Sequence, residues 1–540
     1  MHAVQGEDPA LTVDRLNELL LACSLVLLVA VAAVRLTSRT GLPSLLLYLA
    51  IGIALGHGGL GVEFSDVQLT QLLGYSALVI ILAEGGLGTR WSEIRPAIPA
   101  AAMLATLGVG ISVGVTALAA HHLAGLSWQA ALVLGAVVSS TDAAAIFSVL
   151  RRVPLPPCLS GVLEAESGFN DAPVVILVVA FSTHHPHLSQ WPMLLGEIAL
   201  ELLIGLAIGL LVGRVGALTL RAVALPAFGL YPIAVLALIV AAYAAAALLH
   251  GSGFLAAYVS ALVLGNAALP HRPSVRGFAD AVAWLAQIGM FILLGLLVHP
   301  AQLWRHIWPT LLVGGVLTLV ARPLSVLIAL WPFARPWRER ALVSWAGLRG
   351  AVPIVLATIP VVEGVEDSER IFGVVFVLVI VFTLVQGPTL PWLARWLRLG
   401  EGEQAVDVDI EAAPLERLRG YLLSVTIPRA SRMHGVEIHE LRLPPEAAVT
   451  LVVREGRSFV PQPTTMLRRG DELLVVATDA VREAVERRLV AVGRGGRLAG
   501  WLGTDGQRPR RPGRAAEWRR LGGLRRRLRH PRRRERARPG

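Results

Sequence analysis

The sequence predicts an all-α membrane protein of about thirteen transmembrane helices, followed by a small cytoplasmic α/β domain. Three observations predict this class. Hydrophobic residues make up 54% of the 540 residues, and the mean hydropathy of +0.63 is well above that of soluble domains. Apolar stretches of helical length recur from residue 16 to residue 398. The connections between them alternate between arginine-rich and arginine-poor, which is typical of a chain that crosses a bilayer repeatedly.

Each apolar stretch has about the length of a membrane-spanning helix, roughly 20 residues. The approximate centres of the thirteen stretches are Leu27, Ala50, Ile80, Gly108, Val138, Val174, Ala207, Ala237, Leu262, Phe291, Leu317, Val352 and Val379. The first stretch follows an acidic start with Glu7, Asp8 and Asp14. Because a secretory signal begins with positive charge and ends at a cleavage site, we expect this stretch to remain as the first span.

Arginine placement predicts the orientation of the chain. The connections after the odd-numbered spans carry two or three arginines, whereas those after the even-numbered spans are nearly free of arginine. The positive-inside rule then puts residues 1–15 outside and the C-terminus in the cytoplasm, with residues 16–398 crossing the cytoplasmic (inner) membrane. The arginines concerned are Arg35 and Arg39, Arg90 and Arg95, Arg151 and Arg152, Arg214 and Arg221, Arg272 and Arg276, Arg335, Arg338 and Arg340, and Arg395 and Arg398.

This orientation makes spans 1 to 6 and spans 8 to 13 two inverted six-helix repeats, a layout found in secondary transporters. In that pairing the fifth span corresponds to the twelfth. Residues 139–142 (Ser-Ser-Thr-Asp) interrupt the fifth span, and residues 347–353 (Gly-Leu-Arg-Gly-Ala-Val-Pro) interrupt the twelfth. Such interruptions at corresponding positions predict two unwound helices that cross at a binding site.

The sixth span carries the residues that we expect to bind the transported ion. A charge at bilayer depth costs about 3 kcal/mol, so chains retain one mainly where it serves a function. On a helix Ser167 and Asp171 share one face, and Glu166 and Asn170 share the neighbouring face. Carboxylate and hydroxyl oxygens suit a monovalent cation, and desolvation disfavours the charged form of a buried carboxylate. We therefore expect Asp171 to hold a cation and a proton in turn.

Three further residues are candidates for this site. Asp142 and Thr141 lie at a similar depth on the fifth span, and Asp142 either faces the ion or offsets the dipoles of the broken half-helices. Glu84, on the third span, either faces the ion path or lies near the cytoplasmic end of its span. We expect Asn170 to form hydrogen bonds around the broken helix. Since the chain contains no Lys, no second carboxylate–lysine pair moves extra charge, which predicts electroneutral exchange.

Two buried arginines lie on other spans. We expect Glu166 and Arg349 to form a structural salt bridge, because a lone buried charge is costly. Arg322, on the eleventh span, is expected to pair with a neighbouring helix or to line the pathway.

Three motifs, in order, resemble those of the monovalent cation:proton antiporters of the NhaP and sodium/proton-exchanger type. They are residues 140–143 (Ser-Thr-Asp-Ala), 166–171 (Glu-Ser-Gly-Phe-Asn-Asp) and 347–351 (Gly-Leu-Arg-Gly-Ala). The resemblance covers residues 16–398. It implies a core domain and a dimerisation domain, elevator-like alternating access, and a homodimer. For single residues it implies the following roles: transport for Asp171, support for Asn170 and Asp142, the salt bridge for Glu166 and Arg349, and ion contacts for Ser167, Thr141 and Glu84.

The chain beyond residue 398 is predicted to contain a linker (399–417), an α/β domain (418–490) and an arginine-rich, disordered tail (491–540). Strand-like stretches lie at residues 421–427, 447–454 and 472–477, and a helix-like one at 479–489. The domain resembles the C-terminal lobe of potassium-conductance regulators of the RCK (TrkA) type. This pairing favours K⁺ over Na⁺ as the exchanged cation. The lobe either binds a small ligand such as a cyclic dinucleotide or serves assembly.

Other classes of protein fit the sequence less well. The formal charge of +11 is largely a property of the tail, since seventeen arginines and three acidic residues lie from Arg494 onward. It therefore does not predict specific nucleic-acid binding, and contact with anionic lipid is one alternative to an idle tail. No nucleophile–base pair, metal cluster or cofactor motif indicates an enzyme. A Na⁺(Li⁺)/H⁺ antiporter stays open as an alternative, and a ligand-gated cation channel is a remote one, because no carbonyl filter sequence is present.

Overall fold

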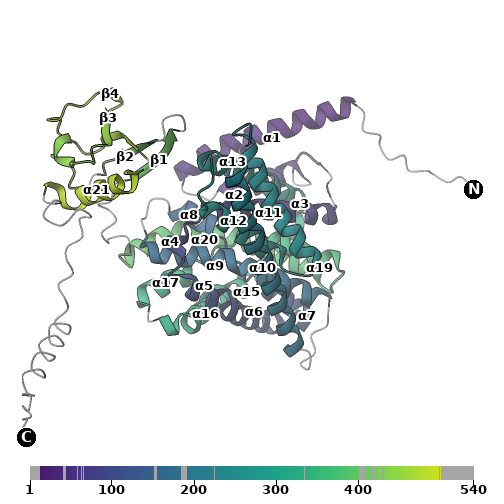
Figure 1. Ribbon diagram of the computed structural model, residues 1–540. Coiled ribbons are helices and arrows are strands. Elements are labelled where there is room, and N and C mark those ends of the chain that lie inside the picture. The colour runs from purple at the N-terminus through teal and green to yellow at the C-terminus, as the bar shows by residue number, and fades with distance from the viewer. Residues whose placement is uncertain are drawn as a thin grey trace, which may run out of the picture. The chain divides into compact units, whose positions relative to one another are not determined.

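Figure 1 shows the computed structural model of the chain. The structure describes residues 13–40, 44–56, 59–62, 64, 66–150, 155–183, 191–223, 225–298, 300–333, 335–399, 409–415, 420–428, 431–478, 480–497 and 499. The chain divides between residues 402 and 403 into two compact units, which are described separately.

The first unit is helical. Its α-helices are α1 (Val13–Thr40), α2 (Ser44–Leu55), α3 (Val67–Gly88), α4 (Trp91–Ile94), α5 (Ile98–Met103), α6 (Val109–Ala124), α7 (Trp128–Val137), α8 (Ala143–Leu150), α9 (Pro157–Thr183), α10 (Trp191–Ala222), α11 (Leu230–Leu248), α12 (Gly253–Asn266), α13 (Arg272–Leu296), α14 (Pro300–Leu303), α15 (Ile307–Val316), α16 (Arg322–Ala329), α17 (Trp337–Trp345), α18 (Ala351–Leu356), α19 (Thr358–Val362) and α20 (Ser368–Trp396). In Figure 1, α10, α11 and α12 lie side by side.

The predicted spans correspond to these helices. Within the described residues, eight helical segments are long and apolar enough to cross a membrane. The other predicted spans are the short helices α2 and α12, the interrupted pairs around α7 and α18, and α9. The helix α9 is long, but it carries Glu164, Glu166 and Asp171. The predicted all-α membrane fold is therefore confirmed.

The two predicted interruptions cross each other. Residues 138–142 separate α7 from α8, and residues 346–350 separate α17 from α18. The backbone N–H of Asp142 donates a hydrogen bond to the carbonyl oxygen of Leu348 at 2.9 Å. A Cβ atom on Gly350 would overlap the Asp142 carboxyl group, so only glycine permits this approach. The predicted crossing of these two unwound segments is thereby confirmed.

Two other corresponding spans contain π-helical turns, which the sequence did not predict. One turn (Leu104–Gly108) joins α5 to α6 in the fourth span, and the other (Leu317–Ala321) joins α15 to α16 in the eleventh. The first turn packs against α16 and the second against α6. A π-turn shifts the side chains that follow it around the helix axis, and Arg322 is the first residue after the second turn.

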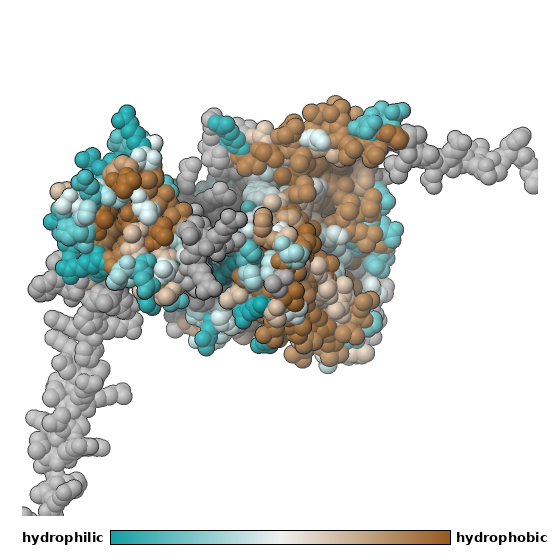
Figure 2. All heavy atoms as spheres, turned by 45° about the horizontal axis from the view of Figure 1, so that its top comes forward, coloured by the Kyte–Doolittle hydropathy of each residue, from teal (hydrophilic) through white to brown (hydrophobic). Residues whose placement is uncertain are grey.

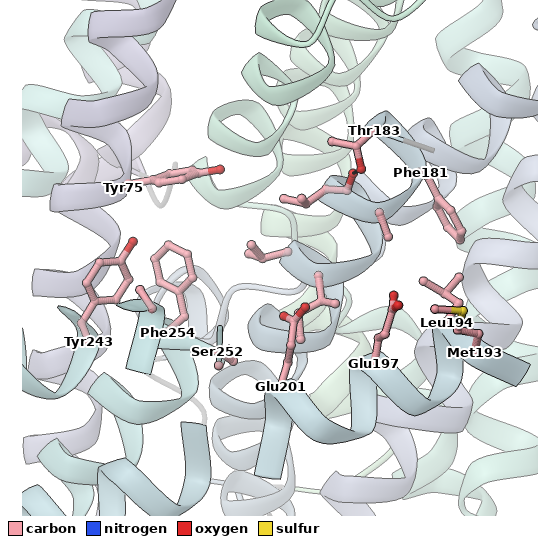
Figure 3. A pocket seen from close by; sticks show the side chains of 17 residues that line it. Tyr75, Phe181, Thr183, Met193, Leu194, Glu197, Glu201, Tyr243, Ser252 and Phe254 are labelled. Carbon is pink, nitrogen blue, oxygen red and sulfur yellow. Dashed lines mark hydrogen bonds between the residues drawn. The ribbon is translucent and has the colours of Figure 1, made fainter. Parts of the chain in front are cut away.

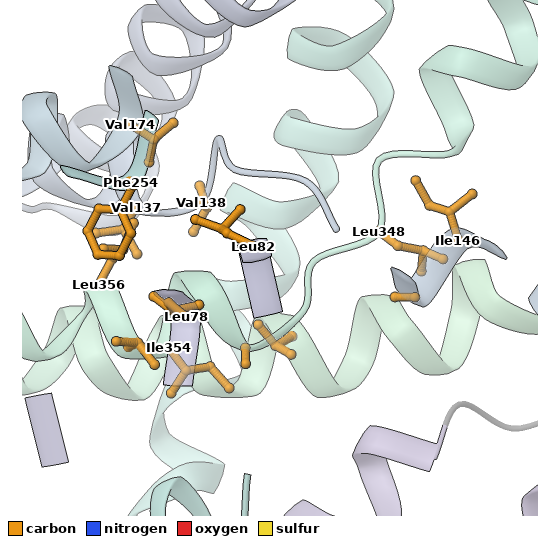
Figure 4. Packing of buried hydrophobic residues seen from close by; sticks show 14 of the residues in the cluster. Leu78, Leu82, Val137, Val138, Ile146, Val174, Phe254, Leu348, Ile354 and Leu356 are labelled. Carbon is orange, nitrogen blue, oxygen red and sulfur yellow. The ribbon is translucent and has the colours of Figure 1, made fainter. Parts of the chain in front are cut away.

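Apolar side chains surround the crossing point. Figure 4 shows Leu78 and Leu82 of α3, Val137 and Val138 at the end of α7, and Leu348 between α17 and α18, all of which are buried. This packing excludes water and lowers the local dielectric, which strengthens the polar contacts that it encloses.

The face of the first unit seen in Figure 2 has large apolar areas, drawn in brown. Only 6% of the apolar window of α1 and 11% of that of α10 is buried. Large exposed tryptophans lie near the ends of other spans: Trp304, Trp308, Trp331, Trp337, Trp392 and Trp396. Tryptophans in such positions are typical of the interface between a bilayer and water.

The second unit is the expected α/β domain. Among the described residues it contains a five-stranded antiparallel sheet in the order β1-β2-β5-β3-β4 and the helix α21 (Arg482–Gly495). The strands are β1 (Asp409–Leu415), β2 (Gly420–Thr426), β3 (Ala447–Arg454), β4 (Arg457–Phe459) and β5 (Glu472–Thr478). A buried apolar cluster that includes Leu423, Val475 and Leu489 joins the sheet to α21.

Two predictions at the edges of this domain need correction. The segment 399–417 is not only a linker, because β1 lies within it and pairs with β2. The sequence did not predict this strand, because it contains Pro414 and no β-branched residue other than Ile410. A strand at the edge of a sheet tolerates both features. The predicted tail 491–540 begins too early, since α21 continues to Gly495. Residues 400–408 and 500–540, and residues 1–12 at the other end, lie outside the described residues.

Candidate functional site

The helix α9 places Asp171 against the break between α7 and α8. Asp171 is buried, with 7% of its surface exposed. Its Oδ1 atom accepts a hydrogen bond of 2.6 Å from the hydroxyl of Ser140. Its Oδ2 atom accepts none within the described residues. One oxygen of this carboxyl group is therefore left for a proton or a cation.

Two other side chains of α9 hold the same break at Thr141. The hydroxyl of Ser167 donates to the backbone carbonyl oxygen of Thr141 at 2.9 Å. The Nδ2 atom of Asn170 donates to the hydroxyl of Thr141 at 2.7 Å. Asn170 thus binds the broken helix, as the sequence led us to expect, and its buried Oδ1 atom has no hydrogen-bond partner in the described part of the chain.

Asp142 lies at the start of α8. Its Oδ1 atom accepts a hydrogen bond of 3.1 Å from the backbone N–H of Ala145. A carboxylate in this position stabilises the positive end of the helix dipole. Of the two roles left open for Asp142, this contact favours the dipole role.

The predicted salt bridge between Glu166 and Arg349 is wrong. Glu166 instead pairs with Arg322, whose NH1 atom lies 2.5 Å from Glu166 Oε1. Both side chains are almost fully buried. Arg349 donates to the carbonyl oxygen of Gly347 at 2.8 Å. The π-turn before α16 is the physical reason, since it rotates Arg322 relative to a regular helix.

The two arginines nevertheless lie close together. A Cβ atom on Gly347 would come within 3.2 Å of both guanidinium groups. Glu166 is the carboxylate that forms an ion pair in this cluster. The cluster therefore holds α9, α16 and the break before α18 together.

Glu84 is not hydrogen-bonded to the residues around Asp171 in the described part of the chain. It is half-buried on α3 and makes no hydrogen bond to Asp171, Ser140 or Thr141. Its Oε1 atom lies near the end of α3, 3.9 Å from where a Cβ atom on Gly88 would be. The structure thus joins Asp171, Asn170, Ser167 and Thr141 around the break, with Asp142 next to Thr141, and the role of Glu84 stays a prediction.

Sequence reasoning gave Ser140 no role. The residue belongs to the polar stretch that interrupts the fifth span, and that stretch was the available signal. Which of its two serines faces Asp171 depends on the geometry of the unwound segment. Ser139 donates to the carbonyl oxygen of Gly135, so only Ser140 reaches the carboxylate.

A cavity of about 470 Å³ lies along the C-terminal half of α9. Figure 3 shows Glu197 and Glu201 of α10 on one side of it and the rings of Tyr75, Tyr243 and Phe254 on another. Val175, one turn beyond Asp171, also lines it. Asp171 itself is not among the lining residues, so the cavity ends short of the site.

The chemistry of the site is that of hard oxygen ligands. Carboxylate, hydroxyl and backbone carbonyl oxygens converge from Asp171, Ser140, Ser167 and Thr141. Such oxygens suit alkali cations. Among the described residues, no group of three or more His, Cys, Asp or Glu side chains is arranged as a resident metal site.

Comparison with known protein families gives two matches. The family model described as "Sodium/hydrogen exchanger, transmembrane" matches residues 25–396. The model described as "TrkA-C domain" matches residues 422–490.

Individual relatives agree with these matches. The K⁺/H⁺ antiporter NhaP of Alkalimonas amylolytica is 38% identical over 473 residues, which cover 86% of this chain and 82% of the relative. The K⁺/H⁺ antiporter NhaP2 of Shewanella oneidensis is 35% identical over 485 residues, which cover 87% and 83%. Among solved structures, the sodium proton antiporter MjNhaP1 from Methanocaldococcus jannaschii aligns with a TM-score of 0.63 at 22% identity. That alignment covers 71% of this chain and 100% of the other, and it concerns the fold alone.

Proposed function

Since this chain belongs to the sodium/hydrogen exchanger family and is therefore a monovalent cation:proton antiporter rather than an enzyme, we propose that it exchanges one potassium ion for one proton. The observation that carries this proposal is the buried carboxyl group of Asp171, which has one oxygen bonded to Ser140 and the other without a hydrogen bond from any described residue. A carboxylate so enclosed needs either a proton or a cation to balance its charge. Competition of the two for one group produces exchange.

In the proposed mechanism, the break of α7–α8 and the helix α9 move as one body. Ser140 and Thr141 stay bonded to α9 through Asp171, Asn170 and Ser167. The pair of Glu166 and Arg322 adds α16 to this body. The ion site would then be exposed alternately to each side without being taken apart.

Potassium is proposed because the two relatives described above are named for it and because a TrkA-C domain follows the membrane unit. The oxygen ligands around Asp171 also accept Na⁺ or Li⁺. A Na⁺(Li⁺)/H⁺ antiporter of the same mechanism is therefore the second candidate.

We also propose that the chain lies in the cytoplasmic (inner) membrane with its N-terminus outside and its C-terminus in the cytoplasm, as the arginine-rich connections favour. A homodimer is proposed as well. It is supported by the long apolar surfaces of α1 and α10, which the other described residues leave largely exposed. We also propose the domain boundaries predicted from the sequence, apart from the two that the structure corrected, at the linker and at the start of the tail.

The C-terminal domain is proposed to bind a small regulatory ligand, for which a cyclic dinucleotide is one chemical candidate. Its support is the match to the TrkA-C domain. An assembly role is the alternative.

The test of the proposal is proton flux in everted membrane vesicles with lithium, sodium, potassium and rubidium chloride added in turn. Wild-type protein should respond to potassium. Asp171→Asn should abolish the response to every cation, because the amide cannot release a proton. Glu366→Gln, which removes an exposed carboxylate, is the matched control and should leave exchange unchanged.

Three outcomes would contradict parts of the proposal. Near-normal exchange by Asp171→Asn would remove this residue from the mechanism. A response to sodium and lithium alone would select the second candidate. Currents that reverse at the potassium equilibrium potential would indicate a channel.

A further inference from the structure

A second polar group lies on the same face of α9 as Asp171. Glu164 precedes Asp171 by seven residues, which is two helical turns or about 10 Å along the axis. It accepts a hydrogen bond from the hydroxyl of Thr89, the residue that ends α3. This contact joins α9 to α3. It lies between Asp171 and the N-terminal end of α9.

Thr89 is held rigidly in this position. Its carbonyl oxygen accepts a hydrogen bond of 2.9 Å from Asn266 Nδ2, at the end of α12. The Oδ1 atom of Asn266 in turn accepts from the backbone N–H of Trp91 at 2.8 Å. The site is therefore built from three helices rather than from mobile surface side chains.

Tyr258 of α12 completes the group. The side chain is buried, with 2% exposed, and its hydroxyl has no hydrogen-bond partner among the described residues. That hydroxyl faces α9 one turn beyond Glu164, since a Cβ atom on Gly168 would lie 2.8 Å from it. The ring reaches α9 because residue 168 is glycine: a Cβ atom there would collide with the Tyr258 ring.

Glu84 adds a second carboxylate. Its Oε1 atom would lie 3.9 Å from a Cβ atom on Gly88, the residue that precedes Thr89. Two carboxylates near each other repel, and a buried hydroxyl without a partner costs about 1–3 kcal/mol. A bound monovalent cation removes both costs, because it neutralises the carboxylates and accepts the phenol and threonine oxygens as ligands.

We propose that Glu164, Glu84, Thr89 and Tyr258 form a second binding site for the transported monovalent cation, between Asp171 and the membrane face at which α9 begins. The inference rests on the proposed antiport function. The site holds the cation two turns from Asp171, before it reaches that residue. It therefore governs the apparent affinity for the cation on one face of the membrane, and it leaves the proton-exchanging step at Asp171 unchanged.

The first experiment measures exchange at graded potassium concentrations on each face of the membrane, in everted and in right-side-out vesicles. Glu164→Gln should raise the apparent KM for potassium about tenfold on the face where α9 begins, the size expected for loss of one charge-assisted ligand. Tyr258→Phe keeps the ring against Gly168 and should raise it about threefold, as expected for loss of a neutral ligand. The maximal rate and the KM on the other face should stay unchanged for both variants.

Glu197→Gln is the matched control, because Glu197 is a carboxylate in the cavity beyond Asp171. It should leave the KM on the first face unchanged. A fall in the maximal rate without a change in KM, or an equal change on both faces, would overturn the second site.

A binding measurement separates this proposal from the function itself. Purified Asp171→Asn protein should still bind one rubidium ion per chain, and Asp171→Asn combined with Tyr258→Phe should bind it more weakly. Absence of rubidium binding to Asp171→Asn would refute the second site even if Asp171 proves essential for exchange. Normal exchange by Asp171→Asn would instead refute the proposed function.

Discussion

At the scale of single residues, the neighbours of Asp171 decide how much charge the site can move. Ser140 donates a neutral hydrogen bond to Asp171, and the adjacent Asn170 is an uncharged amide bonded to Thr141. Glu166, on the neighbouring face of α9, forms an ion pair with Arg322. We therefore propose that Asp171 is the one group of the site that exchanges a proton for a cation.

The first prediction from this arrangement is that exchange moves no net charge. A transporter that moves one net charge gains or loses about 2.3 kcal/mol per 100 mV, so its currents are readily detected. Proteoliposomes on a sensor electrode should give no sustained current after a potassium concentration jump, while a pH dye inside the same vesicles reports exchange. A sustained current with the sign of excess protons would contradict one-for-one exchange.

The second prediction concerns the corrected salt bridge. Because Glu166 pairs with Arg322, breaking that pair should destabilise the protein by about 3–5 kcal/mol. A double-mutant cycle of Glu166→Gln with Arg322→Gln should show strong coupling in thermal unfolding followed by size-exclusion chromatography. The matched cycle with Arg349→Gln should show weaker coupling. Stronger coupling to Arg349 would restore the pairing expected from the sequence.

Sequence reasoning reached the site residues more readily than their partners. A carboxylate and an amide in the middle of an apolar span are visible at Asp171 and Asn170, because the cost of burial makes them conspicuous. The choice between Arg322 and Arg349 was not visible, since both are buried arginines on distant spans. It depends on a π-turn, and such a turn leaves no regular pattern in the hydropathy.

At the scale of elements, the crossing of the two breaks is what positions the site. Asp142 and Leu348 are joined through their backbones, and Gly350 lies against the carboxyl group of Asp142. The close approach needs a residue without a side chain, which explains the glycine in the motif. Polar residues and Gly in two corresponding spans were sufficient to predict this crossing.

The third prediction is that Gly350→Ala disrupts the crossing. The added methyl group would overlap Asp142, and overpacking of this kind costs about 1–3 kcal/mol. Exchange should fall more than tenfold, and the unfolding temperature should drop, as measured by flux assay and thermal melt. Gly315→Ala is the control, because nothing lies within 4 Å of its added Cβ atom. Equal effects of the two substitutions would show that the approach at Gly350 is not required.

Elements without a strong hydropathy signal were the ones that the sequence missed. The strand β1 has only one β-branched residue and contains a proline, and it forms because β2 offers a free edge. The strand β4 has only three residues. Both are stabilised by pairing rather than by their own residue preferences, which a reading of local pattern does not detect.

At the scale of the whole molecule, a membrane unit that can carry out exchange is followed by a separate α/β domain. All the residues that we place at the ion lie in the first unit. The second unit has its own buried core, which is what a domain needs to fold independently. Such an arrangement suits regulation of exchange rather than participation in it.

The fourth prediction follows from this division. A chain that ends at Leu399 should retain cation:proton exchange, but the pH and the potassium concentration at half-maximal rate should shift, as measured in everted vesicles. Asp471→Ala in the full chain is the matched variant. Asp471 is fully buried and accepts two hydrogen bonds of 2.8 Å from Arg454, and it raises the pKa of that guanidinium group.

Loss of this contact should destabilise the C-terminal domain by about 2–3 kcal/mol without touching the membrane unit. If the domain regulates exchange, the substitution and the truncation should shift the same parameters in the same direction. Unchanged pH and potassium dependence in both variants would limit the domain to assembly. Complete loss of exchange in the truncated chain alone would mean that the membrane unit needs the domain to fold.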